Sequence, residues 1–141
     1  MVKEQGQGLK KRILEEMTVD HASALEKHFE LAKHIIKITK EGKVDLTYKD
    51  EFTGKEQILL YLIGKQYARE AGLVNTEDVG NKELMDELGL PRGSILPAIK
   101  DLKDGSKIKE VKKGKYTHHV ISVNMIEKTL KSALKKIEKD S

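Results

Sequence analysis

The stretch NKELMDELGLPRGSILPAIKDL, residues 81–102, decides the fold of this 141-residue chain. Leu84 and Leu88 are four residues apart and predict a short helix over residues 82–88, which Asn81 would cap. Gly89 ends this helix and permits a sharp turn into a second one. The apolar face of that second helix is formed by Ile95, Ile99 and Leu102, and Gly105 ends it.

The second helix can start at either of two residues, Pro91 or Ser94. A start at Ser94 places Pro97 in the first turn, where its missing N–H costs little, whereas an earlier start would let Pro97 kink the helix. The sequence therefore favours the late or distorted start. With the apolar face turned inward, Leu96 and Lys103 lie on a flank, and the outward side holds Gly93, Pro97, Lys100, Asp101 and Asp104.

The segments on either side of this helix pair have clear periodicities as well. A wide apolar face predicts a helix over residues 55–71, ended by Gly72. Residues 108–123 are rich in valine, isoleucine, tyrosine and threonine and predict a β-hairpin with its tip at Lys112–Lys115. Apolar residues on one side predict a last helix over residues 125–139, namely Ile126, Leu130, Ala133, Leu134 and Ile137.

The N-terminal third is predicted to be a helical extension. Residues 1–8 should form a flexible tail, and residues 9–40 should be helical with a break at residues 18–20, where Thr18 or Asp20 could cap a second helix. A single long helix with a phase slip is the alternative. The stripe Ala22, Leu25, Phe29, Ala32 and Ile36 could pack on the domain or on its copy in a dimer, and alternation at Val44, Leu46 and Tyr48 predicts a strand.

From residue 55 onward, the order helix, short helix, glycine turn, helix, hairpin, helix resembles the winged helix-turn-helix superfamily, and archaeal-type members most. The resemblance implies a mainly α fold with a small β-hairpin: an N-terminal helical extension with a short strand over residues 9–50, and a winged-helix domain with a C-terminal helix over residues 51–141. It implies that residues 91–104 are the recognition helix and residues 107–123 the wing. It also implies a homodimer through the N-terminal or the C-terminal helix.

Charge is distributed unevenly along the chain, whose formal net charge is +4. Residues 1–90 carry 14 Lys/Arg and 17 Asp/Glu, whereas residues 91–119 carry 8 and 3. The positive charge thus lies where the resemblance places the recognition helix and the wing, which indicates a polyanionic partner.

Together, charge and resemblance predict a protein that binds double-stranded DNA, with a role in transcription regulation. Lysines on the wing would neutralise phosphates, and the start of the recognition helix would approach base edges. The predicted DNA-contacting residues are Arg92, Ser94, Lys100, Lys103, Lys107, Lys112, Lys113, Lys115 and His118.

The recognition helix also departs from the pattern of DNA-reading members. Leu96 and Pro97 stand where arginine, serine, glutamine or threonine are common, and their side chains cannot donate hydrogen bonds to base edges. Asp101 and Asp104 would be repelled by phosphates. The alternative function is therefore a protein–protein interaction module that uses the helix face around Leu96 and Pro97.

The sequence gives little support to a membrane, metal-binding or catalytic function. The chain has no cysteine and no run long enough to span a membrane, which fits a cytoplasmic protein without thiolate metal sites. His21, His28 and His34 are spaced by seven and six residues, and neither spacing is the i, i+4 pair that holds a metal on a helix. No nucleophile with a neighbouring base stands out, so we expect neither catalysis nor a cofactor.

Overall fold

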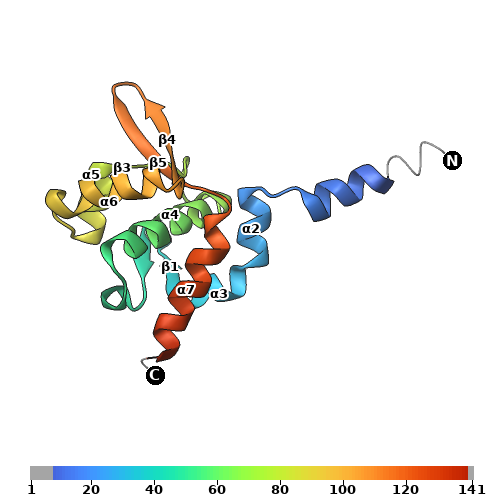
Figure 1. The fold of residues 1–141 in the computed structure, drawn as a ribbon, viewed down its shortest axis with the longest axis horizontal. Helices are drawn as coiled ribbons and strands as arrows, with labels where there is room; N and C mark the ends of the chain where they lie inside the picture. Colours follow the sequence, from blue (N-terminus) through green and yellow to red (C-terminus); the bar gives the residue numbers. More distant parts are fainter. Residues whose placement is uncertain (1–7, 140–141) are drawn as a thin grey trace.

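Helix α4 (Gly54–Glu70) lies at the centre of the molecule, as the computed structural model of residues 8–139 shows (Figure 1). Thr53 begins it with a capping box: its side chain accepts a hydrogen bond from the Glu56 amide, and the Glu56 carboxylate accepts one from the Thr53 amide. A helix buried on nearly all sides must be apolar all round, and the fully buried residues of α4 include Ile58, Leu60, Leu62 and Ile63.

A second layer packs against α4 from the C-terminal part of the chain. It comprises β3 (Val79–Gly80), α5 (Asn81–Leu88), α6 (Arg92–Asp104), β4 (Ile108–Lys113), β5 (Tyr116–Ile121) and α7 (Met125–Lys139). The three strands form an antiparallel sheet in the order β3-β5-β4. As predicted, Leu84, Leu88 and the inner residues of α6 are buried, and Gly89 ends α5 with a φ of 69°.

The N-terminal part supplies the other side of the core. Residues 8–12 are α-helical and continue into the π-helical turn η1 (Ile13–Met17). The predicted break follows, and Asp20 caps α2 (His21–Lys27) by accepting a hydrogen bond from the Ser23 amide at 2.7 Å. Then come α3 (Phe29–Ile35), a hairpin of β1 (Ile36–Ile38) and β2 (Val44–Leu46), and a short 3-10 turn, η2 (Lys49–Glu51). The prediction of a tail over residues 1–8 falls, except for Gly8, outside the described residues.

Three boundaries predicted from the sequence are wrong. The helix expected to reach residue 40 ends at Ile35, because residues 36–38 pair with β2 in the register Ile36↔Leu46. Helix α5 is preceded by Gly80 as N-cap, and the Asn81 side chain binds elsewhere. For α6 the favoured late start at Ser94 is wrong and the earlier of the two possible starts is found: Pro91 is the N-cap and Arg92 the first helical residue, so Pro97 lies inside the helix.

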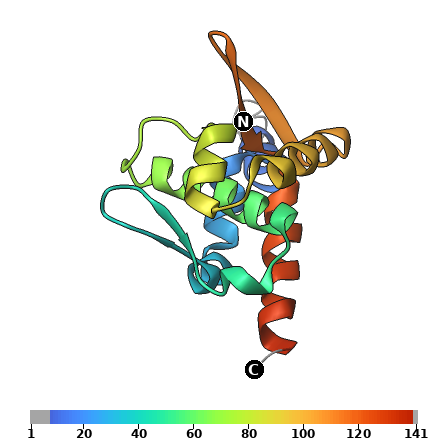
Figure 2. The same ribbon diagram turned by 90° about the vertical axis from the view of Figure 1, so that its left-hand side faces the viewer.

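One buried core joins the extension to the rest of the described chain. Leu25, Ile35 and Val44 belong to the same cluster of buried residues as Ile95, Ile121 and Leu130. Figure 2 shows α2, α3 and the β1–β2 hairpin on one side of α4, and α5, α6 and the sheet on the other. The first helix, residues 8–17, is the exception, since it projects from the body (Figure 1).

Gly64 allows the closest approach between α4 and the β1–β2 hairpin. A Cβ atom at Gly64 would lie 2.5 Å from Val44 Cγ1 and 3.2 Å from Ile36 Cγ2. We therefore expect Gly64→Ala to lower the free energy of unfolding by about 1–3 kcal/mol, despite the gain in helix propensity. Urea denaturation checks this. Gly93→Ala is the matched control, because no atom beyond its own helical turn lies within 4 Å of its added Cβ, and it should not destabilise the fold.

Candidate nucleic-acid interface

The β4–β5 hairpin rises from the body beside α6 (Figures 1 and 2). Its two strands pair antiparallel from Ile108↔Ile121 to Lys113↔Tyr116, and Gly114 makes the tip with a φ of 63° that glycine adopts without strain. Ile108 and Ile121 anchor the base of the hairpin in the core. The tip lysines are exposed, as the sequence predicts.

The two faces of the hairpin have different neighbours. Side chains alternate along a strand, and directly paired residues share a face. Ile108, Glu110 and Lys112 therefore lie on one face, and Glu110 forms an ion pair with Lys103 of α6. This ion pair ties the hairpin to α6. Lys112 lies on the same face of the hairpin as Glu110, which is the face toward α6. Lys109, Val111 and Lys113 lie on the opposite face with their partners Tyr116, His118 and Val120.

Asp78 holds two of the predicted contact residues on that opposite face. Its carboxylate lies 2.7 Å from His118 Nδ1 and 3.1 Å from Lys113 Nζ. Burial of the Asp78 carboxyl opposes its charge, but hydrogen bonds from His118 and Lys113 outweigh this and lower the pKa of Asp78 below its usual 3.8. Lys113 and His118 are thus engaged by a carboxylate, which leaves less of their charge for a phosphate.

His119 fixes the base of the hairpin to α5. Its side chain is buried, and Nε2 lies 2.8 Å from the Asn81 amide oxygen, which is the contact that replaces the predicted Asn81 cap. Burial, then repulsion by Lys103 and His118, lowers the pKa of His119 to about 4. The Nδ1 atom is buried without a hydrogen-bond partner among the described residues. His119 is therefore neutral near pH 7, and its role is structural: it holds the base of the hairpin against α5.

The outer side of α6 carries the other predicted contacts. Arg92 and Ser94 in the first turn are exposed, as is Lys100. Asp101 forms an ion pair with Lys55 of α4 at 2.8 Å. The hydrogen bond from Lys55 and the positive charge of Lys55 lower the pKa of the Asp101 carboxyl below its usual value. Lys55 thereby offsets one of the two aspartates expected to repel phosphates, while Asp104 is exposed.

The remaining lysines differ in whether their ammonium groups are already paired with other side chains. Lys103 is paired with Glu110, whereas Lys107 is exposed at the start of the hairpin. Lys112 Nζ donates a hydrogen bond to Thr117 Oγ1 at 3.1 Å, and Lys115 lies over the ring of Tyr116. Tyr116 is 63% exposed at the tip, and sequence reasoning missed it. A tyrosine next to a lysine-rich glycine turn is a signal that could have identified it.

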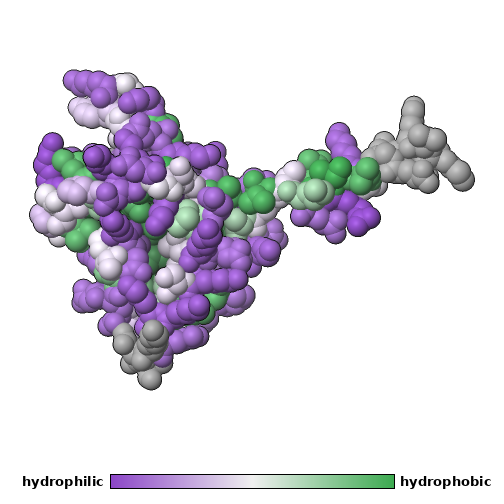
Figure 3. All heavy atoms as spheres, viewed as in Figure 1, coloured by the Kyte–Doolittle hydropathy of each residue, from purple (hydrophilic) through white to green (hydrophobic). Residues whose placement is uncertain are grey.

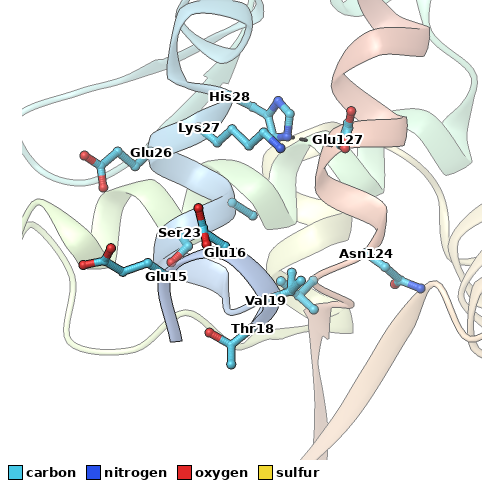
Figure 4. A pocket seen from close by; sticks show the side chains of 12 residues that line it. Glu15, Glu16, Thr18, Val19, Ser23, Glu26, Lys27, His28, Asn124 and Glu127 are labelled. Carbon is cyan, nitrogen blue, oxygen red and sulfur yellow. Dashed lines mark ion pairs between the residues drawn. The ribbon is translucent and has the colours of Figure 1, made fainter. Parts of the chain in front are cut away.

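A hollow of about 590 Å³ lies between the projecting segment, α2 and the start of α7, and its lining is mainly acidic, in contrast to the basic hairpin (Figure 4). Its lining includes four carboxylates, from Glu15, Glu16, Glu26 and Glu127, and His28 lies 3.6 Å from Glu127. This side of the molecule is unsuited to a polyanion. Within residues 8–139, no group of three or more His, Asp or Glu side chains could hold a metal ion, and no helix is long and apolar enough to cross a bilayer.

Comparison of the chain with protein-family models, with curated proteins and with solved structures found no match.

Proposed function

We propose that this protein is a DNA-binding protein of the winged-helix type that regulates transcription. The observation that carries the proposal is a lysine-tipped hairpin that rises beside α6 and is tied to it by the Lys103–Glu110 pair. The chain order α4, β3, α5, α6, β4, β5 and the sheet order β3-β5-β4 support the winged-helix assignment.

In this proposal, the hairpin and α6 have different tasks on a duplex. Lys107, Lys112 and Lys115 contact phosphates, which supplies affinity without reading sequence. Arg92 and Lys100, which can donate hydrogen bonds to guanine in the major groove, supply what base readout the protein has, together with Ser94. Lys103 is a positioning residue, because its charge holds Glu110 and with it the hairpin.

The alternative function, a protein-interaction module around Leu96 and Pro97, has weaker support. Pro97 is exposed, but Leu96 is half-buried, so this face of α6 offers little apolar area to a partner. The neighbouring Lys55–Asp101 pair and Lys100 make it polar. We therefore retain DNA as the partner of this side of the molecule.

The salt dependence of DNA binding tests the proposal. Fluorescence anisotropy with labelled random duplexes, in a series of salt concentrations, should give a linear fall of log K with log salt, with a slope of about −2.7 from the three lysine–phosphate contacts, and steeper where Arg92 and Lys100 also meet phosphates. A chloride series on the unlabelled protein by circular dichroism controls for unfolding. Absence of binding at low salt, or binding whose strength does not change with salt, would contradict the proposal.

A further inference from the structure

The helix over residues 8–17 leaves its apolar side chains in solvent. All residues from Gly8 to Asp20 are exposed, and Met17 at 75% is the most exposed of five large apolar side chains, the others being Leu9, Ile13, Leu14 and Val19. Figure 3 shows these apolar atoms along the projecting arm. An apolar patch of this kind on a protein surface marks an interaction site.

An apolar groove on the body of the same chain matches this helix in character. It consists of two adjoining hollows of about 270 and 380 Å³ that share Phe29 and Tyr67. The rings of these two residues meet edge to face, and Phe29 remains 49% exposed. Further lining residues come from α2 and β1, namely Ala22, Leu25, Ile36 and Ile38.

Charges at the two ends of the groove are opposite in sign. Glu26 and Glu70 line the hollow toward α2, whereas Lys33 and Lys37 line the hollow toward β1. The projecting helix is charged in the reverse sense, with Lys10, Lys11 and Arg12 in its first half and Glu15 and Glu16 in its second. A helix laid along the groove with its start over α2 would therefore bring opposite charges together at both ends.

We propose that two copies of this chain exchange their first helices, so that residues 8–17 of each copy lie in the groove beside Phe29 and Tyr67 of the other. The exchange is symmetric, because each copy supplies one helix and one groove. The extended residues 18–20 lead the helix away from its own body, and the Asp20 cap of α2 fixes that exit (Figure 1). The inference does not depend on DNA binding.

Molar mass in solution, measured by light scattering after gel filtration, tests the exchange. We expect wild-type protein at twice the chain mass of 15.9 kDa. Ile13→Asp with Leu14→Asp, in the helix, and Phe29→Ser, in the groove, should each give the monomer mass. Tyr116→Ser is the matched control, because Tyr116 is also large and exposed but lies on the hairpin, and this variant should remain a dimer.

Charge reversal tests the direction of the helix in the groove. Lys33→Glu with Lys37→Glu should lose the dimer, and adding Glu15→Lys with Glu16→Lys in the same chain should restore it. A monomeric wild type, or a Phe29→Ser variant that stays dimeric because the helices pair with each other, would overturn the proposal. A wild type that is monomeric and binds vesicles of anionic lipid through residues 8–17 would also overturn the proposal, and would assign the apolar helix to a membrane surface. Circular dichroism of each variant shows whether loss of the dimer reflects loss of the fold.

Discussion

Replacing Lys107, Lys112 and Lys115 together with glutamine is expected to weaken binding to random duplex DNA about 100-fold near physiological salt. All three are exposed on the hairpin, and among the described residues none of them forms an ion pair. Each phosphate contact that releases a counterion contributes about a fivefold gain in affinity at 0.15 M salt, so three contribute about 100-fold. The slope of log K against log salt should also become less steep by about 2.7.

A matched control separates this effect from a general change of charge. Lys43, Lys128 and Lys135 are exposed lysines outside the hairpin and α6, and their triple change to glutamine alters the net charge by the same amount. That variant should bind with affinity within about twofold of wild type and with an unchanged slope. If both triple variants lose affinity equally, binding follows net charge alone and the hairpin is not the contact surface.

Lys113 is omitted from the first triple because of its contact with Asp78. Its Nζ atom is 3.1 Å from the carboxylate, and Asp78 also holds His118. Changing Lys113 would therefore disturb the hairpin as well as remove a cation, and the two effects would be mixed in one measurement.

The helix pair and the hairpin could be predicted from the sequence because their signals are local. Leu84 and Leu88, and the spacing of the buried residues of α6, depend only on helix periodicity, and they are buried as predicted. The same periodicity misled at Ile36, which continues the apolar stripe of α3 but lies in β1. What ends the helix is pairing with Leu46, ten residues away across a turn, and helix periodicity carries no information about such a partner.

The candidate site could be predicted only as a set of exposed cations. Composition and the hairpin pattern located Lys112 and Lys115 at the tip, where they are. The sequence could not show that His118 would be held by a carboxylate 40 residues earlier, since Asp78 lies in a loop without periodicity. The position of Asn81 before a helix likewise predicts a cap, whereas its amide oxygen is hydrogen-bonded to His119 of β5. Both contacts arise from tertiary packing.

Acid is expected to destabilise the protein through His119. In the unfolded chain this histidine takes up a proton near pH 6.5, whereas burial holds its folded pKa at about 4. A group whose pKa is depressed in the folded state stabilises the fold above pH 6.5, and this contribution is lost as pH falls toward 4. The free energy of unfolding should therefore fall by about 2.5 kcal/mol between pH 7 and pH 4.5 on account of His119.

Urea denaturation at a series of pH values, compared between wild type and His119→Gln, measures this contribution. Glutamine retains an N–H donor for the Asn81 oxygen but cannot titrate, so the variant should lose most of the decline between pH 7 and pH 4.5 even if its stability at pH 7 is lower. Aspartates with a lowered pKa, such as Asp78, lose their contribution mainly below their usual value of 3.8, outside this window. His34→Gln is the control, because His34 is exposed on α3, and its pH dependence should match that of wild type.

The position of His119 links this acid sensitivity to the proposed DNA interface. Its ring joins β5 to the first residue of α5, and Gly80 beside Asn81 pairs with His118 in the sheet. Because an amide oxygen can only accept, Nε2 carries the proton and Nδ1 is the atom that acid would protonate, at a buried position where no acceptor meets it. Hydrogen exchange should therefore show amides of β5 and β3 losing protection at pH 4.5 before those of α4. Equal loss in all three elements would show that acid acts on the whole core rather than on the root of the hairpin.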